Sequence, residues 1–553
     1  MKTSTICKYI LAIICLMQSF EIQSQEVISR TLNVTAGNLS TLVENQKDLI
    51  TNLTLTGNIN GTDIGTIRSM AKLSVLNLAG ANIIEGGSFY VNRTNVPTAK
   101  NRIPQYMFYS CSNLTSITLP TNVTYIGNGA FFSCKGLTSI TIPSSVTYIG
   151  MFAFNNCTGF TSIIIPSSVT YIDSGAFENC AGLTSITIPN NVTGIDQAAF
   201  IKCSGLTSVT IPNSVTYIGD NAFSWCTGLK KITVSEGNAT YSSVDGVLFN
   251  KNKTQLVAYP NARSNIYTIP NSVKTIGFGA FTGCAGLTSI VIPNNVTAFS
   301  DYAFSECTGL SSITIPGSVT AIGNYAFGGC TGLTSLTMPN SVTNIGNYAF
   351  WSCAGLTSLT ISNKVTVIGE YVFTDCTGVT SVTIPNSVTS IGRSAFYNCK
   401  GLTSITIPKS VTNIGNSAFG SCSELKEVHC KSVTPPAAMT SSFSYINSTC
   451  NLYVPKTSST AYRNSIGWTS FTSIIEEEAT SISETQENNI KVYTEQNTIV
   501  VTGAYLGDEI SVYNESGILL QNTKVTNNIV KINVIPNHMY MIKITGKTFK
   551  VTL

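Results

Sequence analysis

The chain has 553 residues and a formal net charge of +4 at pH 7, and only 10% of its residues are Asp, Glu, Lys or Arg. So few charges, without a cluster of Lys and Arg, argue against a protein that binds a nucleic-acid backbone. A chain of this length is too long for one ordinary globular core. A stacked array of repeats is not subject to that limit, because its core grows with the number of repeats.

The N-terminus is typical of a secretory signal peptide, residues 1–24. Two lysines, Lys2 and Lys8, precede a short apolar run, and Ser24 is a small residue before the expected cut. A lipoprotein signal at Cys15 is the alternative. The apolar run is too short to cross a bilayer, and no later stretch approaches the roughly 20 apolar residues that a span requires. We expect a secreted or cell-surface protein that is soluble or anchored by other means.

Residues 25–106 are irregular and indicate an N-terminal cap. Alternating apolar residues at 53–55 and 73–78 predict two strands, and residues 59–70 between them predict a helix or turn. Arrays of repeats need such atypical end units.

A 23-residue unit then recurs in register, and one step of 58 residues, from Cys226 to Cys284, interrupts it. Such a fixed period is typical of a solenoid. We therefore expect function on a surface. The cysteines that mark the units are Cys111, Cys134, Cys157, Cys180, Cys203, Cys226, Cys284, Cys307, Cys330, Cys353, Cys376, Cys399 and Cys422.

Each unit predicts a strand, a proline that ends it, and a short helical turn. In one unit Leu137, Ile140 and Ile142 alternate as inward-facing residues, and Pro143 follows at once because proline donates no ladder hydrogen bond. The spacing of Ala, Phe and Cys in the sequence A-F-x-x-C predicts one helical turn. The phenylalanine three residues before each cysteine predicts an aromatic spine in the core.

The long step contains a hairpin signal, Asp245-Gly246, between two short apolar runs. The register is restored before Cys284, so we expect the solenoid to continue through a hairpin at residues 241–250.

The C-terminal part predicts a cap, a linker and a small domain. Trp468 and Phe471 are expected to plug the cap, and residues 476–488 are polar and acidic, as in a linker. About seven short strand signals follow, which fits a small β-sandwich.

Catalysis is not expected. The mature chain has only His429 and His538, in different end regions, and the acidic residues Asp173, Asp196, Asp220 and Asp301 belong to separate repeats. These histidines cannot be assembled into a Ser-His-acid or Cys-His site, and the aspartates give no apparent carboxylate pair for glycoside hydrolysis. The cysteine spacing of 23 also lacks the close pairs of zinc sites. We predict no cofactor and no metal.

The repeat cysteines favour a buried, reduced row, because identical small apolar residues suit a stacked core. Pairing between neighbouring coils stays open, since an exported protein meets oxidising conditions. The better candidate for a disulfide is Cys430 with Cys450, expected on adjacent strands of the cap.

The candidate binding surface is the outward side of the repeat strands, where Ser and Thr alternate with the buried aliphatic residues. Some fourteen coils would form a hydroxyl-rich ribbon on the order of 65 Å long at about 4.8 Å per strand. The alternative is that Thr is simply a good strand residue. The first members of this face are Ser116, Thr118, Ser139 and Thr141, and the departures from it are Ile164, Lys230, Lys231 and Val291.

A second candidate is a tyrosine row in the first half of the array: Tyr125, Tyr148, Tyr171 and Tyr217. Such a stripe is either a platform for a sugar or protein, or a ladder that stabilises a sheet.

The repeat L-x-x-I-x-I-P-x-x-V-x-x-I-G-x-x-A-F-x-x-C resembles the BspA-like bacterial surface proteins with leucine-rich repeats. The motifs A-G-N-L-S-T-L near the start and L-Y-V-P with W-T-S-F near the end resemble the family's caps. The last residues, through I-S-V-Y-N-E-S-G-I-L-L, are similar to C-terminal sorting domains of the type IX secretion route of Bacteroidetes. The resemblance implies a right-handed solenoid of strands with short helices or 3₁₀ turns, and surface exposure.

The resemblance also implies adhesion to a protein or glycan on host cells, extracellular matrix or other bacteria. The alternatives are an envelope scaffold without a specific ligand and, third, a secreted glycan hydrolase. The expected parts are the signal peptide (1–24), N-terminal cap (25–106), first solenoid half (107–234), inserted hairpin coil (235–270), second half (271–430), C-terminal cap (431–475), linker (476–488) and a sorting-like β-sandwich (489–553) that contacts the secretion machinery.

Overall fold

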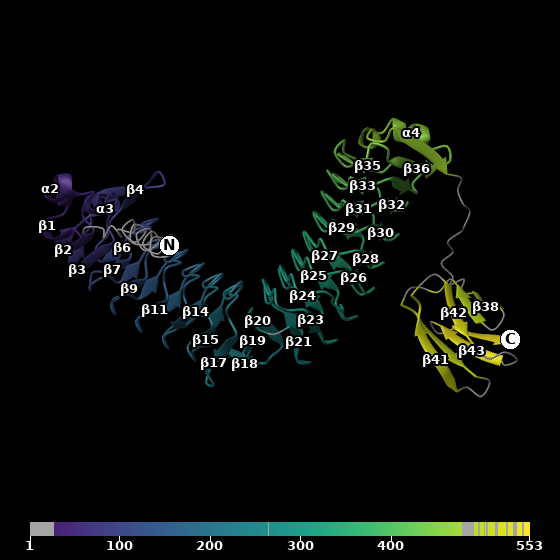
Figure 1. The fold of residues 1–553 in the computed structure, drawn as a ribbon, viewed down its shortest axis with the longest axis horizontal. Coiled ribbons are helices and arrows are strands. Elements are labelled where there is room, and N and C mark those ends of the chain that lie inside the picture. The colour runs from purple at the N-terminus through teal and green to yellow at the C-terminus, as the bar shows by residue number, and fades with distance from the viewer. Residues whose placement is uncertain are drawn as a thin grey trace, which may run out of the picture. The chain divides into compact units, whose positions relative to one another are not determined.

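The computed structural model describes residues 27–263 and 265–477 and, with short gaps, residues 491–552. The chain forms two compact units, residues 1–478 and 479–553. Figure 1 shows the first unit as a stack of short strands and the second as a small β domain. The predicted signal peptide, most of the predicted linker and His538 lie outside the described residues. Within the described part, no helix is long and apolar enough to cross a membrane.

The N-terminal cap is a sheet of longer strands that continues into the repeats. Three parallel strands pair in order with the first repeat strand. The segment predicted as a helix or turn at 59–70 contains a helix, α3. The elements are β1 (Ser29–Val34), α2 (Leu39–Val43), the 3₁₀ helix η1 (Glu44–Gln46), β2 (Asn52–Ile59), α3 (Gly61–Arg68), β3 (Val75–Ile83) and an antiparallel hairpin of β4 (Ser88–Val91) with β5 (Thr94–Pro97).

Each regular repeat has three sides, and the first is a strand of three or four residues. The equivalent strands of neighbouring repeats pair in parallel without a shift of register, so Ser139 lies opposite Ser116 and Thr141 opposite Thr118. We call these strands the first sheet: β7 (Ser116–Thr118), β9 (Ser139–Thr141), β11 (Ser162–Ile164), β13 (Ser185–Thr187), β15 (Ser208–Ile211), β17 (Lys231–Val234), β21 (Ile266–Thr268), β23 (Ser289–Val291), β26 (Ser335–Thr337), β28 (Ser358–Thr360), β30 (Ser381–Thr383), β32 (Ser404–Ile407) and β34 (Glu427–Cys430).

The second side is a two-residue strand that ends on the isoleucine of the I-G motif or on its equivalent. These strands also pair in parallel and form the second sheet. They are β6 (Arg102–Ile103), β8 (Tyr125–Ile126), β10 (Tyr148–Ile149), β12 (Tyr171–Ile172), β14 (Gly194–Ile195), β16 (Tyr217–Ile218), β22 (Thr275–Ile276), β24 (Ala298–Phe299), β25 (Ala321–Ile322), β27 (Asn344–Ile345), β29 (Val367–Ile368), β31 (Ser390–Ile391) and β33 (Asn413–Ile414).

The third side is built from turns, so the predicted helical turn is wrong for the regular repeats. The N–H groups of Gly129, Phe131 and Ser133 donate to carbonyls of the next coil over 2.8, 2.7 and 2.8 Å, whereas the residues between them donate within their own coil. Gly129 and Ser133 both have a φ of 58°, which turns every second N–H toward the neighbour. A helix would direct all of these groups along its own axis. The turns therefore join the coils as a sheet ladder does.

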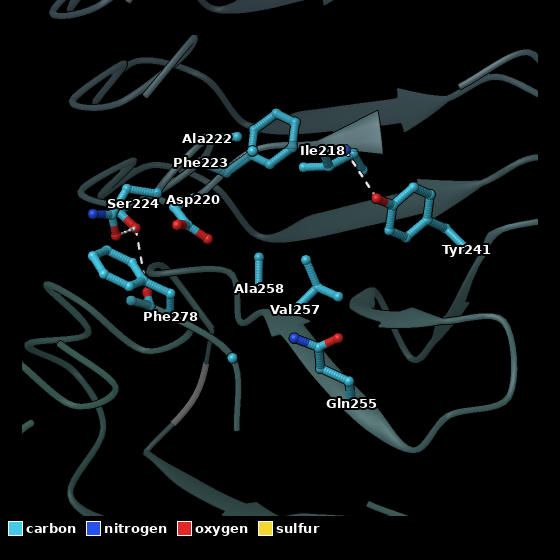
Figure 2. A pocket seen from close by; sticks show the side chains of 14 residues that line it. Ile218, Asp220, Ala222, Phe223, Ser224, Tyr241, Gln255, Val257, Ala258 and Phe278 are labelled. Carbon is cyan, nitrogen blue, oxygen red and sulfur yellow. Dashed lines mark hydrogen bonds between the residues drawn. The ribbon is translucent and has the colours of Figure 1, made fainter. Parts of the chain in front are cut away.

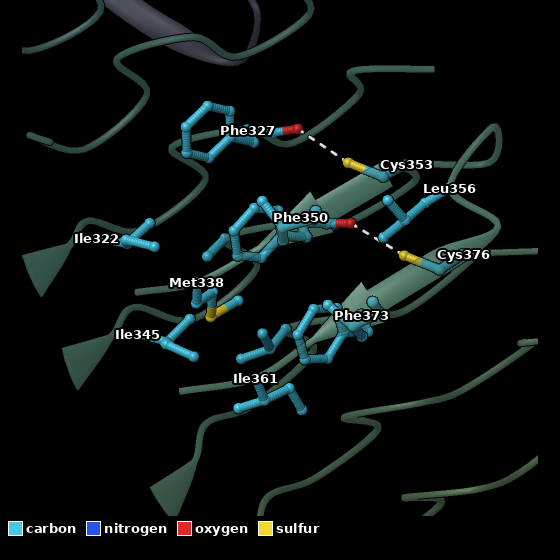
Figure 3. Close-up of a cluster of buried hydrophobic side chains, with 14 of the residues drawn as sticks. Ile322, Phe327, Met338, Ile345, Phe350, Cys353, Leu356, Ile361, Phe373 and Cys376 are labelled. Carbon is cyan, nitrogen blue, oxygen red and sulfur yellow. Dashed lines mark hydrogen bonds between the residues drawn. The ribbon is translucent and has the colours of Figure 1, made fainter. Parts of the chain in front are cut away.

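The core contains the predicted aromatic spine. Phenylalanine rings of successive coils stack at 5.3 Å between Phe327 and Phe350 and at 5.5 Å between Phe350 and Phe373. Figure 3 shows these rings between the isoleucines of the second sheet and the cysteines. The stacked rings form two runs, from Phe108 to Phe223 and from Tyr259 to Phe443.

The hairpin predicted in the long step is present and separates these two runs. It consists of β18 (Tyr241–Val244) and β19 (Val247–Asn250), and β19 pairs with β20 (Gln255–Ala258), from which the second sheet continues into β22. In the first sheet, the Ile232 N–H donates to the carbonyl of Gly246 over 2.8 Å. The hairpin turn thus occupies the edge on which the next repeat strand would pair. The expected single ribbon is divided into two parts.

The C-terminal cap is closed by the predicted aromatic plug. Trp468 is completely buried, contacts Phe443 at 5.1 Å between ring centroids, and donates its indole N–H to the Pro436 carbonyl over 3.0 Å. The cap contains β35 (Ala437–Ala438), β36 (Asn451–Pro455), α4 (Ser459–Arg463), the 3₁₀ helix η2 (Ile466–Trp468) and β37 (Ser473–Glu477).

The second unit is the predicted small β-sandwich. Ile499 and Ile532 of one sheet share a buried cluster with Val512 and Ile542 of the other. The first sheet of this unit has β38 (Lys491–Glu495), β39 (Thr498–Thr502) and β42 (Ile529–Asn533), and the second has β41 (Leu519–Lys524), β40 (Glu509–Tyr513), β43 (Met539–Ile544) and β44 (Lys547–Thr552).

Candidate functional site

The outward side of the first sheet has hydroxyl groups without protein partners. Ser139 and Thr141 are exposed on either side of the buried Ile140, and Ser116 and Thr118 are half-buried. Within the described residues, none of these four hydroxyls has a hydrogen-bond partner in the protein. Hydroxyls elsewhere on the repeat behave differently, since Thr138 donates its hydroxyl to the Thr115 carbonyl over 3.1 Å. The Ser and Thr side chains of the first sheet are therefore available to a ligand.

The departures from this face form two groups. Ile164, at the end of β11, has 81% of its surface exposed and pairs with Thr187 of the next repeat. Lys230, Lys231 and Val291 lie on the coils beside the inserted hairpin. All three are exposed, and Val291 pairs with Thr268 on β21. The structure thus places Ile164 within the first half and the other three departures on the coils that flank the division of the ribbon.

The tyrosine row lies on the second sheet, and much of the surface of its rings contacts other residues of the protein. The rings of Tyr125 and Tyr148 stack at 4.9 Å with an angle of 7°, and the guanidinium of Arg102 covers Tyr125 at 5.0 Å. The ring of Tyr171 lies over Gly194, where an added Cβ would come within 2.3 Å of it. Tyr217 is the most exposed of the four, at 48%.

Two aspartates explain how the tyrosines are held. Asp173 and Asp196 occupy the position at which most repeats have the glycine of I-G. Asp173 accepts a hydrogen bond from the hydroxyl of Tyr148 in the preceding coil, and the carboxylate of Asp196 acts on the hydroxyl of Tyr171 in the same way. Burial, with the hydrogen bond and charge of Asp196, raises the pKa of Tyr171 to about 12. These carboxylates, which sequence reasoning considered for catalysis, therefore contact side chains of the array.

Asp301 has a similar inter-coil role. The carboxylate of Asp301 accepts a hydrogen bond from the main-chain N–H of Asn324 over 2.7 Å. It accepts a second one from the side-chain amide of Asn324 over 3.0 Å. The amide of Asn324 then accepts the N–H of Asn347 over 2.8 Å. A ladder of short polar side chains thus runs along the turn side of the second half.

Sequence reasoning missed a second tyrosine ladder beside these residues. The rings of Tyr302, Tyr325, Tyr348 and Tyr371 stack in turn at 4.8, 4.5 and 4.4 Å, and the guanidinium of Arg393 covers the last ring at 5.6 Å. The available signal was a tyrosine two residues before the spine phenylalanine in four consecutive repeats. The stacked faces are closed to a ligand.

The fourth aspartate, Asp220, faces a small cavity where the first half meets the hairpin (Figure 2). Tyr241 lines the same cavity and accepts the N–H of Ile218 on its hydroxyl over 2.8 Å. Burial raises the pKa of Asp220. The cavity has a volume of about 100 Å³, which is well below the roughly 300 Å³ of ordinary ligand pockets. It suits a few water molecules.

The disulfide predicted between Cys430 and Cys450 is absent, and both are free thiols. The register of β34 and β36 gives the reason, because Glu427 pairs with Asn451. Cys430 lies three residues after Glu427, and Cys450 lies one residue before Asn451. The two are therefore about 13 Å apart along the strands at about 3.3 Å per residue, beyond the roughly 7 Å that a disulfide allows.

The described repeat cysteines are also free thiols, in agreement with the predicted buried and reduced row. Cys134 donates its thiol to the Phe108 carbonyl over 2.9 Å, and Cys157 donates to the Phe131 carbonyl over 3.1 Å. Burial raises the pKa of the Cys157 thiol to about 12. These thiols are therefore protonated core groups.

The model of the BspA type leucine rich repeat region matches in six copies, within residues 70–160, 101–230, 253–380 and 366–489. These ranges cover well over half of the chain. The chain belongs to the BspA-type leucine-rich repeat family. A search of curated proteins found no match.

Solved structures that resemble this BspA-type protein include two bacterial leucine-rich repeat proteins. A leucine rich cell surface protein from Faecalibacterium prausnitzii is 28% identical over 72% of this chain and 82% of its own, with a TM-score of 0.40. A leucine-rich repeat protein from Bacteroides ovatus is 26% identical over 72% of this chain and 98% of its own, with a TM-score of 0.41.

Proposed function

We propose that this BspA-type protein is exported to the cell surface and binds a macromolecular partner, without catalysis, through the outward face of the first sheet. The observation that carries the proposal is the row of Ser and Thr hydroxyls without protein partners, illustrated by Ser139 and Thr141. The partner is a protein or glycan on host cells, extracellular matrix or other bacteria.

The geometry of this face supports many weak contacts with an extended partner. The parallel register places identical side chains in rows along the stack, so one partner motif can be matched repeatedly. The neutral hydroxyls give hydrogen bonds without a large cost of removing charges from water. Ile164, which pairs with Thr187, supplies an exposed apolar contact within the hydroxyl-rich face.

The test is binding of the purified mature chain to immobilised matrix proteins, host cells and glycans. The double variant Thr141→Lys and Thr187→Lys places charge on both sides of Ile164. The control, Val367→Lys, changes a residue that is 49% exposed on the second sheet. Saturable binding that the double variant loses and the control retains supports an adhesin. Binding by none of the three proteins would favour the envelope scaffold, and turnover of a glycan would favour the hydrolase.

We further propose that residues 1–24 direct export and that the β-sandwich at 489–553 contacts the secretion machinery. Deletion of residues 489–553 is expected to leave the protein in the periplasm, which protease accessibility on intact cells measures. Surface display equal to that of the full chain would overturn the sorting role.

A further inference from the structure

A larger pocket, with a volume of about 390 Å³, lies between the β4–β5 hairpin and the turn side of the first repeats. Tyr106, Tyr109, Phe132 and Phe152 supply aromatic side chains to its wall, and Tyr109 stacks on Phe132 at 5.1 Å. The volume falls in the range of ordinary ligand pockets, roughly 300–1,000 Å³.

Three repeats have glycine where others have a side chain, namely Gly129, Gly175 and Gly279, and the pocket lies at the first of them. Gly129 lies at the repeat position that Phe152 and Tyr325 occupy in later coils. Its φ is 58°, and a Cβ there would lie 2.7 Å from the ring of Tyr106. In four repeats of the second half, tyrosines at this position form the stacked ladder, whose ring faces are closed. The ring of Tyr106 lies over Gly129, and the pocket opens beside this ring, where Phe152 is 38% exposed.

The lining is neutral and mixes aromatic rings with amide and hydroxyl groups. None of the described residues that line the pocket has a carboxylate, ammonium or guanidinium group. Asn92 and Thr94 of the hairpin contribute polar groups, and Asn128 accepts the Met151 N–H on its side-chain oxygen over 3.1 Å. The amide N–H₂ of Asn128 has no acceptor among the described residues.

We propose that this pocket binds a neutral sugar ring of a glycan. The apolar C–H face of a pyranose packs on an aromatic ring, and its hydroxyls accept hydrogen bonds from an amide such as that of Asn128. An apolar peptide side chain would fill the space but leave the amide unpaired, which costs free energy. An acidic sugar would find no cation among the lining residues to pair with. This site lies on the turn side of the coils and is separate from the face of the first sheet.

The test is saturation-transfer NMR on the purified mature chain. The probes are the methyl glycosides of glucose, galactose, mannose and N-acetylglucosamine, with methyl glucuronide and N-acetylphenylalanine amide as the acidic and peptide-like comparisons. We expect at least one neutral glycoside to bind more tightly than both comparisons. Its affinity should fall at least tenfold in Phe152→Ala.

The matched control is Tyr325→Ala, which removes a ring from the same repeat position in the closed ladder and should change the affinity less than twofold. Met151→Glu is a second variant, expected to abolish binding. Its charge is compatible with the fold, because Asp301 and Glu370 occupy this repeat position elsewhere. Thermal unfolding followed by circular dichroism checks each variant.

The proposal is overturned if no neutral glycoside binds, if a comparison probe binds more tightly, or if folded Met151→Glu retains binding. The double variant on the first sheet, Thr141→Lys with Thr187→Lys, should bind the glycoside normally. Its result separates failure of this pocket from failure of the proposed adhesive face.

Discussion

The Sγ atom of Cys353 donates a hydrogen bond of 3.2 Å to the main-chain carbonyl of Phe327, which lies 26 residues earlier (Figure 3). Cys376 makes the same contact with Phe350, also over 3.2 Å. The cysteine of each such coil thus contacts the spine phenylalanine of the coil before it. The period of 23 residues and the three-residue spacing of Phe and Cys together produce this link.

Replacement of this thiol should destabilise the array without preventing folding. We expect Cys353→Ala to lower the free energy of unfolding by about 1–2 kcal/mol, because it leaves a small cavity and removes a donor from a buried carbonyl. Urea unfolding followed by circular dichroism measures the change. Cys111→Ala is the control, since Cys111 is half-buried and its thiol has no hydrogen-bond partner among the described residues. Equal losses in the two variants would contradict a role for the hydrogen bond.

The buried thiols should make the protein sensitive to alkali. Burial raises the pKa of Cys157, Cys203 and Cys330 from the ordinary 9.0 to about 12. Between these values the unfolded chain loses thiol protons that the folded chain retains, so the free energy of unfolding decreases as the pH rises above about 9. Each such thiol contributes up to about 1.4 kcal/mol per pH unit.

Urea midpoints measured at pH 7, 8.5 and 10 check this dependence. We expect little change between the first two and a marked fall at pH 10. The native thiols should also resist alkylation by iodoacetamide at pH 8 and react once urea unfolds the chain. Rapid alkylation of the folded protein would contradict the buried row.

The hydroxyl of Tyr148 should matter more than that of its stacked neighbour. Tyr148 donates to the buried carboxylate of Asp173. Tyr148→Phe leaves that carboxylate with one partner fewer, and we expect a loss of about 1–3 kcal/mol in the free energy of unfolding. Tyr125→Phe is the matched control, because the Tyr125 hydroxyl has no partner among the described residues. A loss as large in the control would contradict the assignment.

The N-terminal cap should depend on Asp63, a completely buried residue of α3. Its carboxylate accepts the N–H groups of Gly37, Leu39 and Asn60 over 2.7, 3.0 and 2.9 Å. Asp63→Ala leaves these donors unpaired, and we expect a loss of about 3 kcal/mol or more.

Limited proteolysis offers a local readout of this change, with cleavage expected first before residue 107. Asp48→Ala is the control, because Asp48 has an exposed side chain whose one ionic partner among the described residues is Lys47. Cleavage that begins in the central repeats would contradict a local role for Asp63.

The sequence alone determined the repeated architecture. The period, the alternating aliphatic residues and the spine phenylalanine each recur in register, and stacking identical units leaves one arrangement in which all apolar sides are buried. The plug formed by Trp468 and Phe471 and the hairpin at Asp245-Gly246 were predictable for the same reason, because local chemistry specifies them.

The tertiary structure decided what depends on contacts between coils. The turns that replace the predicted helix exist because alternate N–H groups find acceptors in the next coil. The strand register holds Cys430 and Cys450 too far apart to pair. The positions of the cysteines in the sequence do not reveal that register. The pocket beside Gly129 depends on the β4–β5 hairpin lying next to the turns of the first repeats. These features rest on distances between residues remote in the chain, and the one-dimensional pattern does not contain those distances.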